Sequence, residues 1–465
     1  MRSFFILFLL AIGFVSSANI TLPAVISSNM VLQQKASVKL WGWGAPTEKV
    51  YITTTWGSEK DSAVVTENAK WQVAINTPAA GGPYTITIKG SNTIVLENVL
   101  IGEVWVCSGQ SNMEFNYNWG LPQMKEELPG AAALKLRFFT VPRTTAEAPQ
   151  EDTKAQWQIC DSNTLKSFSA VAFYFGKKLS QNLNVPIGLI NASWGGTPAE
   201  VWTPAEKVTS DTTLRMAAST LTKATGWPIT PGYTFSGMIA PLTNYKIAGA
   251  IWYQGESNTG TASTYQQLFT TMIQSWREKW NNELPFYFVQ IAPFAYGNKN
   301  IGALLREAQT KTLALPKTGM VVTTDLVEDT LDIHPKNKRD VGFRLANLAL
   351  TNTYAQTVVG AQSPVYKSMG FLKNKVLISL SNAMAIVVKG SAATGVFIAG
   401  ADQQFYPAQA TAKGNTLTVW NKAVPQPVAV RYAFSNTAIG NLFSKEGLPV
   451  APFRTDDWVV DTAAK

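Results

Sequence analysis

The sequence predicts an α/β fold in which a parallel sheet flanked by helices lies between two accessory β-sandwich regions. Residues 19–98 alternate apolar and polar side chains with the two-residue period of half-buried strands. From residue 99 to 355, short apolar runs alternate with amphipathic helical segments, which is typical of a parallel sheet covered by helices. From residue 356 to 465 the strand pattern returns.

The N-terminal part divides into a leader and a β region. Arg2 precedes an apolar run at residues 4–15 that is too short to span a bilayer, and Ser16-Ser17-Ala18 follows it. This pattern predicts a signal peptide over residues 1–18, cleaved after Ala18, and hence a secreted or periplasmic protein. No other apolar run has the length of a transmembrane segment.

The central region supplies the strands and helices of the parallel sheet. Strands are expected at residues 185–190, 247–253, 285–291 and 320–324, and helices at residues 265–280, 304–315 and 338–351. Because ligands bind beyond the carboxyl ends of parallel strands, we expect the functional site at that edge. The flanking β regions have their clearest strands at residues 38–43, 84–88, 375–380 and 416–420.

Composition excludes several classes of function. The net charge of +9 falls to +8 without Arg2, but the Lys and Arg residues are scattered, so no nucleic-acid-binding patch is expected. One histidine and two cysteines, Cys107 and Cys160, cannot form a zinc site, and we expect no cofactor. A hard-metal site built only from carboxylates stays open, as does a disulfide between the two cysteines.

The only histidine, His334, is the one candidate for an imidazole base, and it follows Asp332 by two residues. Ser111 lies on a small-residue turn between an apolar strand and a short helix, where its hydroxyl is exposed and backbone N–H groups surround it. Taken singly, the histidine fits a solvated loop and the serine fits a helix cap.

Two further strand ends carry polar or glycine-rich segments. Gly195 and Gly196 follow one strand and allow a ligand to approach the backbone closely. Gln254 and Glu256 follow the next, where the Gln254 amide could donate to an oxyanion and Glu256 could support a neighbouring loop. Ordinary turns are the alternative for both segments.

Four segments occur in a recognisable order: GQSNM around Ser111, SWGGT at 193–197, WYQGESN at 252–258 and DIHPKNK at 332–338. They resemble the four blocks of the SGNH hydrolase superfamily, and more closely the sialate O-acetylesterase branch of secreted carbohydrate esterases. Segments 30–33, 239–242 and 446–454 are also similar to that branch, so the resemblance covers nearly the whole mature chain. It implies an SGNH-hydrolase-like sheet.

The resemblance implies that Ser111 is the nucleophile and that His334 takes the proton of Ser111 and returns it to the leaving sugar. It further implies an oxyanion hole made by the backbone N–H of Ser111, a glycine N–H at Gly195 or Gly196, and the Gln254 side chain. Two residues of the same segments, Asn112 and Glu256, are expected to support the site.

The chain departs from the superfamily pattern at the acid. The superfamily places its aspartate three residues before the histidine, where this chain has Leu331, whereas Asp332 is two before. Three alternatives follow: a triad with Asp332, a Ser–His dyad steadied by a backbone carbonyl, or an acid such as Glu256. Gln254 and Glu256 also stand where the superfamily typically has an asparagine. Cys107 is a rival nucleophile that we expect to be buried and inert.

The expected function is a serine esterase that removes O-acetyl groups from a sugar or glycan, without metal or cofactor. Sialic acid is the leading substrate, with Arg306 as the residue expected to bind its carboxylate, and acetylated xylan or another polysaccharide is the alternative. An inactive carbohydrate-binding protein is the alternative from another class, since 15 tryptophans would suit sugar stacking.

Overall fold

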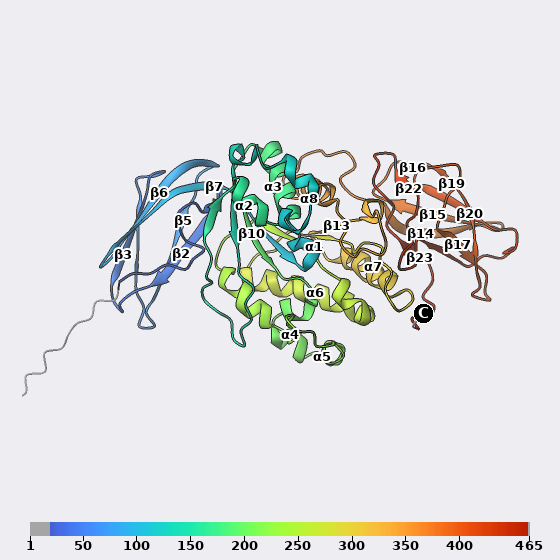
Figure 1. Cartoon of the computed structure of the whole chain (residues 1–465), viewed down its shortest axis with the longest axis horizontal. Coiled ribbons are helices and arrows are strands. Elements are labelled where there is room, and N and C mark those ends of the chain that lie inside the picture. Colours follow the sequence, from blue (N-terminus) through green and yellow to red (C-terminus); the bar gives the residue numbers. More distant parts are fainter. Residues whose placement is uncertain (1–18, 464–465) are drawn as a thin grey trace, which may run out of the picture.

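The computed structural model describes residues 19–463, and its three parts lie in a row (Figure 1). A β region at the N-terminal end and another at the C-terminal end flank a central α/β part. The leader expected at residues 1–18 lies outside the described residues. The predicted fold class is confirmed.

The N-terminal part is a small β-sandwich whose strand pairs are antiparallel except for β1, which pairs in parallel with β7. Its strands are β1 (Val31–Gln33), β2 (Ser37–Trp43), β3 (Lys49–Thr54), β4 (Lys60–Val64), β5 (Lys70–Asn76) and β6 (Gly81–Lys89). Strand β2 pairs with β5, and β3 pairs with β4 and β6. Alternate side chains such as Leu40, Ile52 and Ile86 are buried between the layers, as the two-residue period requires.

Strand β7 (Thr93–Gly109, 17 residues) belongs to both the sandwich and the central sheet. Its first half pairs antiparallel with β6, and its second half pairs in parallel with β10 and β11. The expected boundary after residue 98 therefore falls inside one continuous strand. Because the backbone does not turn there, the sandwich is joined rigidly to the sheet that carries the site.

The central sheet has the strand order β13-β12-β11-β7-β10-β8-β9, and only the β8–β9 pair is antiparallel. The strands are β8 (Leu136–Thr140), β9 (Trp157–Ile159), β10 (Ile187–Ser193), β11 (Gly249–Tyr253), β12 (Phe286–Val289) and β13 (Thr318–Val321). Helices cover both faces: α1 (Ser111–Glu114), α2 (Ser162–Ser167), α3 (Ala170–Leu183), α4 (Ala205–Thr209), α5 (Thr212–Ser219), α6 (Ala262–Trp280), α7 (Ile301–Lys311) and α8 (Lys338–Asn352).

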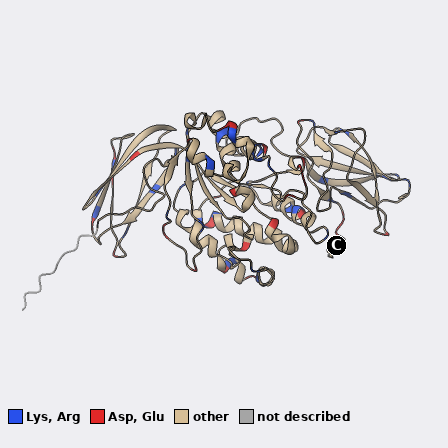
Figure 2. Ribbon diagram, in the orientation of Figure 1, with Lys and Arg blue, Asp and Glu red and all other residues tan. Residues whose placement is uncertain are grey.

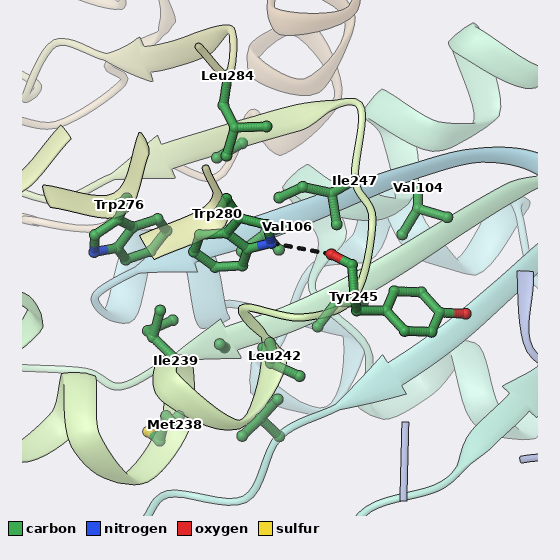
Figure 3. Packing of buried hydrophobic residues seen from close by; sticks show 14 of the residues in the cluster. Val104, Val106, Met238, Ile239, Leu242, Tyr245, Ile247, Trp276, Trp280 and Leu284 are labelled. Atoms are coloured by element: carbon green, nitrogen blue, oxygen red, sulfur yellow. Dashed lines mark hydrogen bonds between the residues drawn. The ribbon is translucent and has the colours of Figure 1, made fainter. Parts of the chain in front are cut away.

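The two faces of the sheet bury two separate apolar cores. Ala250 and Trp252 of β11 pack in the core that contains α6, whereas Ile251 and Tyr253 pack in the core that contains α3 and α8. In Figure 3, the indole N–H of Trp280 points at the backbone of Tyr245 and donates to its carbonyl oxygen at 3.0 Å. Buried indoles need such an acceptor, so this bond sets the position of the end of α6.

The C-terminal part contains antiparallel sheets around a core of their own. Its strands are β14 (Val365–Leu372), β15 (Lys375–Ser381), β16 (Ile386–Val388), β17 (Val396–Ala399), β18 (Phe405–Pro407), β19 (Gln409–Lys413), β20 (Thr416–Trp420), β21 (Ala429–Tyr432), β22 (Leu442–Ser444) and β23 (Phe453–Arg454). Arg454 attaches this part to α7 through two 3.0 Å bonds to the Glu307 carboxylate.

Charged residues are spread over all three parts of the chain (Figure 2). Among residues 19–463, no helix is both long enough and apolar enough to cross a bilayer.

Glu103 in β7 ties the N-terminal region to the central part, because its carboxylate accepts hydrogen bonds from Gln33 (2.8 Å), Gln34 (2.7 Å) and Tyr354 (2.8 Å). We expect Glu103→Ala to lower the free energy of unfolding by about 2–4 kcal/mol, since three partly buried donors lose their acceptor. Urea denaturation measures this loss. Glu97→Ala, at an exposed position of the same strand, is the control, and equal midpoints for the two variants would contradict the role of Glu103.

Candidate active site

The predicted site segments meet at the carboxyl edge of the central sheet. The Ser111 turn follows β7, the glycine turn follows β10, the Gln254 segment follows β11, and the His334 loop lies beyond β13. Parallel strands bring these ends together although the segments are far apart in sequence. The sequence prediction of a site at this edge therefore agrees with the geometry.

The turn before Ser111 depends on a close approach of two strands. Gly109 has φ 138°, and a Cβ there would overlap the Tyr253 carbonyl oxygen of β11. Only glycine allows this conformation and spacing. Ser111 then begins α1, and a Cβ at Gly195 would lie 3.2 Å from the Ser111 Cβ, so the glycine turn is in direct contact with the serine.

Ser111 and His334 form the central pair of the site. The Ser111 Oγ lies 2.9 Å from the His334 Nε2, which is hydrogen-bond distance. The His334 side chain is 31% exposed, and its ring lies beside the Phe115 ring with centroids 5.4 Å apart. A base in contact with a serine hydroxyl and still open to solvent can activate that serine for attack on a substrate.

Asp332 lies near His334 without bonding to its ring. The Asp332 Oδ1 is 3.8 Å from the His334 Nδ1 and accepts the backbone N–H of His334 at 2.9 Å. The carboxylate thus orders the loop and supplies a nearby negative charge. Glu256, the alternative acid, is bonded to Asn112 at 2.6 Å.

The surroundings of His334 keep its imidazole neutral. Its pKa is lowered from 6.5, first by burial and then by the positive charge of Lys338, with a smaller contribution from Lys336 in the same direction. Asp332 opposes this shift. A neutral imidazole is the form that can accept a proton from Ser111.

Asn112 connects the nucleophile helix to the histidine loop. Its Nδ2 donates to the carbonyl oxygen of Ile333 at 3.1 Å and to the Glu256 Oε1 at 2.6 Å. Its Oδ1 accepts from the Lys338 Nζ at 2.5 Å. One buried amide therefore contacts the residue before His334, the start of α8 and the segment after β11.

The two charged partners of Asn112 are themselves buried. Burial lowers the pKa of Lys338 to about 7, opposed by the negative charge of Glu256. Burial raises the pKa of Glu256, opposed by Asn112 and by Lys338. Because buried ionisable groups need partners of good geometry, the Asn112 amide is a structural requirement of this cluster.

The oxyanion donors differ from the expected set. The Gly195 N–H donates to the Glu114 Oε2 at 2.8 Å, and Arg143 holds the other oxygen of that carboxylate at 2.7 Å. Among the described residues, no hydrogen bond occupies the backbone N–H of Ser111 or of Gly196. The glycine turn is therefore in place, with one of its two donors already occupied.

The Gln254 side chain faces the interior, away from its expected role. Its Nε2 donates to the Thr197 carbonyl oxygen at 3.2 Å and to the Asn258 Oδ1 at 2.8 Å, and its Oε1 accepts from the Tyr265 hydroxyl at 2.8 Å. Both polar ends are thus occupied, so Gln254 positions the segment and donates nothing toward Ser111.

Arg306 also lies elsewhere than expected. It is buried in α7 and donates to the carbonyl oxygen of Ser435 in the C-terminal part, so it is inaccessible to a substrate carboxylate. Cys107 and Cys160 are both buried free thiols. Burial raises the pKa of Cys107 well above its ordinary value, which agrees with an inert thiol.

Three residues of the site were missed from the sequence: Glu114, Arg143 and Lys338. Glu114 and Lys338 stand inside or directly beside the recognised motifs, so their position was a usable signal. Arg143 lies outside all four motifs, and only the fold brings it into contact with Glu114.

We expect Asn112→Ala to lower the free energy of unfolding by about 2–4 kcal/mol, because it leaves the buried Lys338 ammonium and Glu256 carboxylate without their shared partner. Chemical denaturation at pH 7 measures the loss. Asn118→Ala, at an exposed position of the next helical segment (Tyr117–Trp119), is the matched control. Equal stabilities for the two variants would show that the amide is dispensable.

Comparisons with known proteins agree with this geometry. The family model described as "Carbohydrate esterase, sialic acid-specific acetylesterase" matches residues 101–351. The sialate O-acetylesterase of Pongo abelii is 31% identical, with 78% of this chain and 77% of that protein covered. The corresponding protein of Homo sapiens is 30% identical over the same shares.

A solved structure extends the similarity to the whole fold. XAC1771, a carbohydrate acetylesterase from Xanthomonas citri, superimposes with a TM-score of 0.86 at 35% identity, covering 95% of this chain and all of that one (100%). The match includes the central sheet and both flanking β regions. The chain therefore belongs to the carbohydrate esterase family of sialic acid-specific acetylesterases and is a carboxylic-ester hydrolase.

Proposed function

We propose that this chain removes O-acetyl groups from sugars through an acetyl-Ser111 intermediate, with O-acetylated sialic acid as its leading substrate. The observation that carries the proposal is the 2.9 Å contact between the Ser111 Oγ and the His334 Nε2 at the carboxyl edge of the sheet. The leader expected at residues 1–18 supports export of the enzyme.

In the first half-reaction, the Ser111 Oγ attacks the acetyl carbonyl carbon while the His334 Nε2 takes the hydroxyl proton. The tetrahedral intermediate then collapses: the bond to the sugar oxygen breaks, and the imidazolium returns the proton to that oxygen. In the second half-reaction, His334 removes a proton from water, the hydroxide attacks acetyl-Ser111, and acetate leaves as Ser111 recovers its proton.

The oxyanion donors in this proposal are the backbone N–H groups of Ser111 and of the Gly195–Gly196 turn. The Gly195 donor becomes available when the Glu114 Oε2 releases it to the substrate, while Arg143 keeps its bond to the other carboxylate oxygen. Each such donor is worth roughly 10²–10³ in turnover, so two or three of them account for a large part of the rate.

His334 acts mainly as one member of a Ser–His pair. Asp332 stabilises the imidazolium by its charge, because its carboxylate lies 3.8 Å from the Nδ1. Its other contact, to the backbone N–H of His334, holds the ring in reach of Ser111. Asp332 thus contributes through charge and loop order, and Glu256 through Asn112.

Sialic acid is favoured by the family description and by the two mammalian relatives named above. The structure adds a second argument, which is a positive charge that an anionic sugar can reach. The Arg143 side chain is 48% exposed and lines a cavity of about 220 Å³ beside Glu114. Acetylated xylan is the alternative within the same chemistry. An inactive binding protein is disfavoured because the serine and histidine are in bonding contact.

We expect Ser111→Ala to lower acetate release from 9-O-acetylated sialic acid by about 10³-fold or more, since the nucleophile is lost. A covalent serine reagent should label the wild type and leave the variant unlabelled. Circular dichroism of both proteins controls for folding. Release from acetylated xylan alone would move the assignment to that substrate, and labelling of neither protein would favour the binding-protein alternative.

The pH dependence of kcat/KM tests the environment of His334. Because its pKa is lowered, the imidazole stays neutral and active as the pH falls, and activity should decline only below pH 6.5. Lys338→Met removes the strongest neighbouring positive charge and should move this decline to higher pH.

Lys336→Met, which removes an exposed and weaker neighbour, is the matched control and should move the decline less. Identical profiles for the wild type and both variants would mean that His334 is not the titrating base.

A further inference from the structure

A cavity of about 470 Å³ opens beside the catalytic turn, and the mechanism above does not use it. Gly196 and Pro198 of the turn line one side, the Leu221–Trp227 stretch lines another, and Ser257 lines a third. Gly195, the residue before Gly196, is in direct contact with Ser111. The cavity therefore begins next to a residue that contacts the nucleophile.

Trp227 is the main side chain of this cavity. Its side chain is 51% exposed, although tryptophans of the central part such as Trp202 and Trp252 are fully buried. Its ring packs directly on Gly196, where φ is 76° and any Cβ would overlap the indole. An aromatic ring is thus held flat against the catalytic turn, with much of its surface left to solvent.

A tight turn presents this indole. The backbone N–H of Trp227 donates to the Ala224 carbonyl oxygen at 3.3 Å. Gly226, which lies between them, has φ 84°, and no atom lies within 4 Å of the position that a Cβ would take there. The turn is closed by its own backbone hydrogen bond, and the left-handed conformation that it requires is supplied by Gly226. Its geometry places the Trp227 ring over Gly196.

The chemistry of the cavity indicates the class of its ligand. Among the described lining residues there is no Asp, Glu, Lys or Arg, while Thr220, Thr222 and Ser257 supply hydroxyl groups. An exposed aromatic face with hydroxyls around it suits the C–H face of a pyranose ring, whose own hydroxyls need hydrogen-bond partners. An anionic group would find no counter-charge here.

We propose that this cavity is the sugar subsite of the enzyme: a pyranose ring of the acetylated glycan stacks on Trp227, so that its ester reaches Ser111. The inference rests on the proposed function and adds the residue that holds the sugar. It also separates two parts of substrate recognition. The uncharged cavity binds the pyranose ring, and a substrate carboxylate must point away from the cavity.

Trp227→Ala and Trp227→Phe test the subsite with two kinds of ester. The probes are 9-O-acetylated sialic acid and acetylated xylo-oligosaccharide, which carry a sugar, and p-nitrophenyl acetate, which does not. We expect kcat/KM of Trp227→Ala to fall about tenfold on the sugar esters, mostly through KM, and less than twofold on p-nitrophenyl acetate. Trp227→Phe should recover part of the loss.

Trp420→Ala is the matched control, since it removes a tryptophan from β20 in the C-terminal part. An equal loss on all three esters would overturn the proposal and leave Trp227 a structural support of Gly196. No loss on any ester would overturn it too.

Failure of the proposed function is distinguished by a binding measurement. If the wild type hydrolyses p-nitrophenyl acetate but neither sugar ester, saturation-transfer NMR of the same sugars with Ser111→Ala protein decides the subsite. Signals that disappear in Ser111→Ala/Trp227→Ala support the sugar subsite independently of turnover. Absence of signal in both proteins would overturn it.

Discussion

The hydrogen bond from Asn112 to the Ile333 carbonyl oxygen is the contact on which the site depends. Ser111 and His334 are 223 positions apart; Ser111 directly follows β7, and His334 lies on the loop between β13 and α8. The sheet brings those ends to one edge, but strand pairing alone does not set the distance between two loops. The buried Asn112 amide belongs to the Ser111 segment and bonds to the His334 loop. It therefore sets the distance between the two loops and holds Ser111 within reach of His334.

This arrangement has an electrostatic cost that the cluster itself offsets. Lys338 and Glu256 are both removed from water, which disfavours the charge on each. The amide between them accepts from the ammonium and donates to one oxygen of the carboxylate, so each charged group has one partner, while the Glu256 Oε2 has none among the described residues. The same ammonium helps to keep His334 neutral, which connects the stability of the cluster to the protonation state of the base.

Strand β7 is the rigid structural support of the site. It pairs with β6 in the sandwich and with β10 and β11 in the central sheet, and it ends at the turn that carries Ser111. The Glu103 carboxylate, halfway along, accepts bonds from both parts. The nucleophile turn is therefore anchored by two layers of strands, whereas the histidine loop depends on Asn112 and Asp332 for its position.

The sequence by itself predicted the fold class, and it predicted that the segments of Ser111, His334 and the glycine turn meet at one edge of the sheet, because strand periodicity and local motifs are properties of neighbouring residues. It did not reveal helix α3, because residues 170–176 are all buried and the exposed polar residues that mark an amphipathic helix come only in its second half. Only the tertiary structure decided which way each side chain points. Gln254 turns toward Asn258, Arg306 toward the C-terminal part, and Glu114 onto the Gly195 N–H, since each polar group is satisfied by whichever partner the packing brings near.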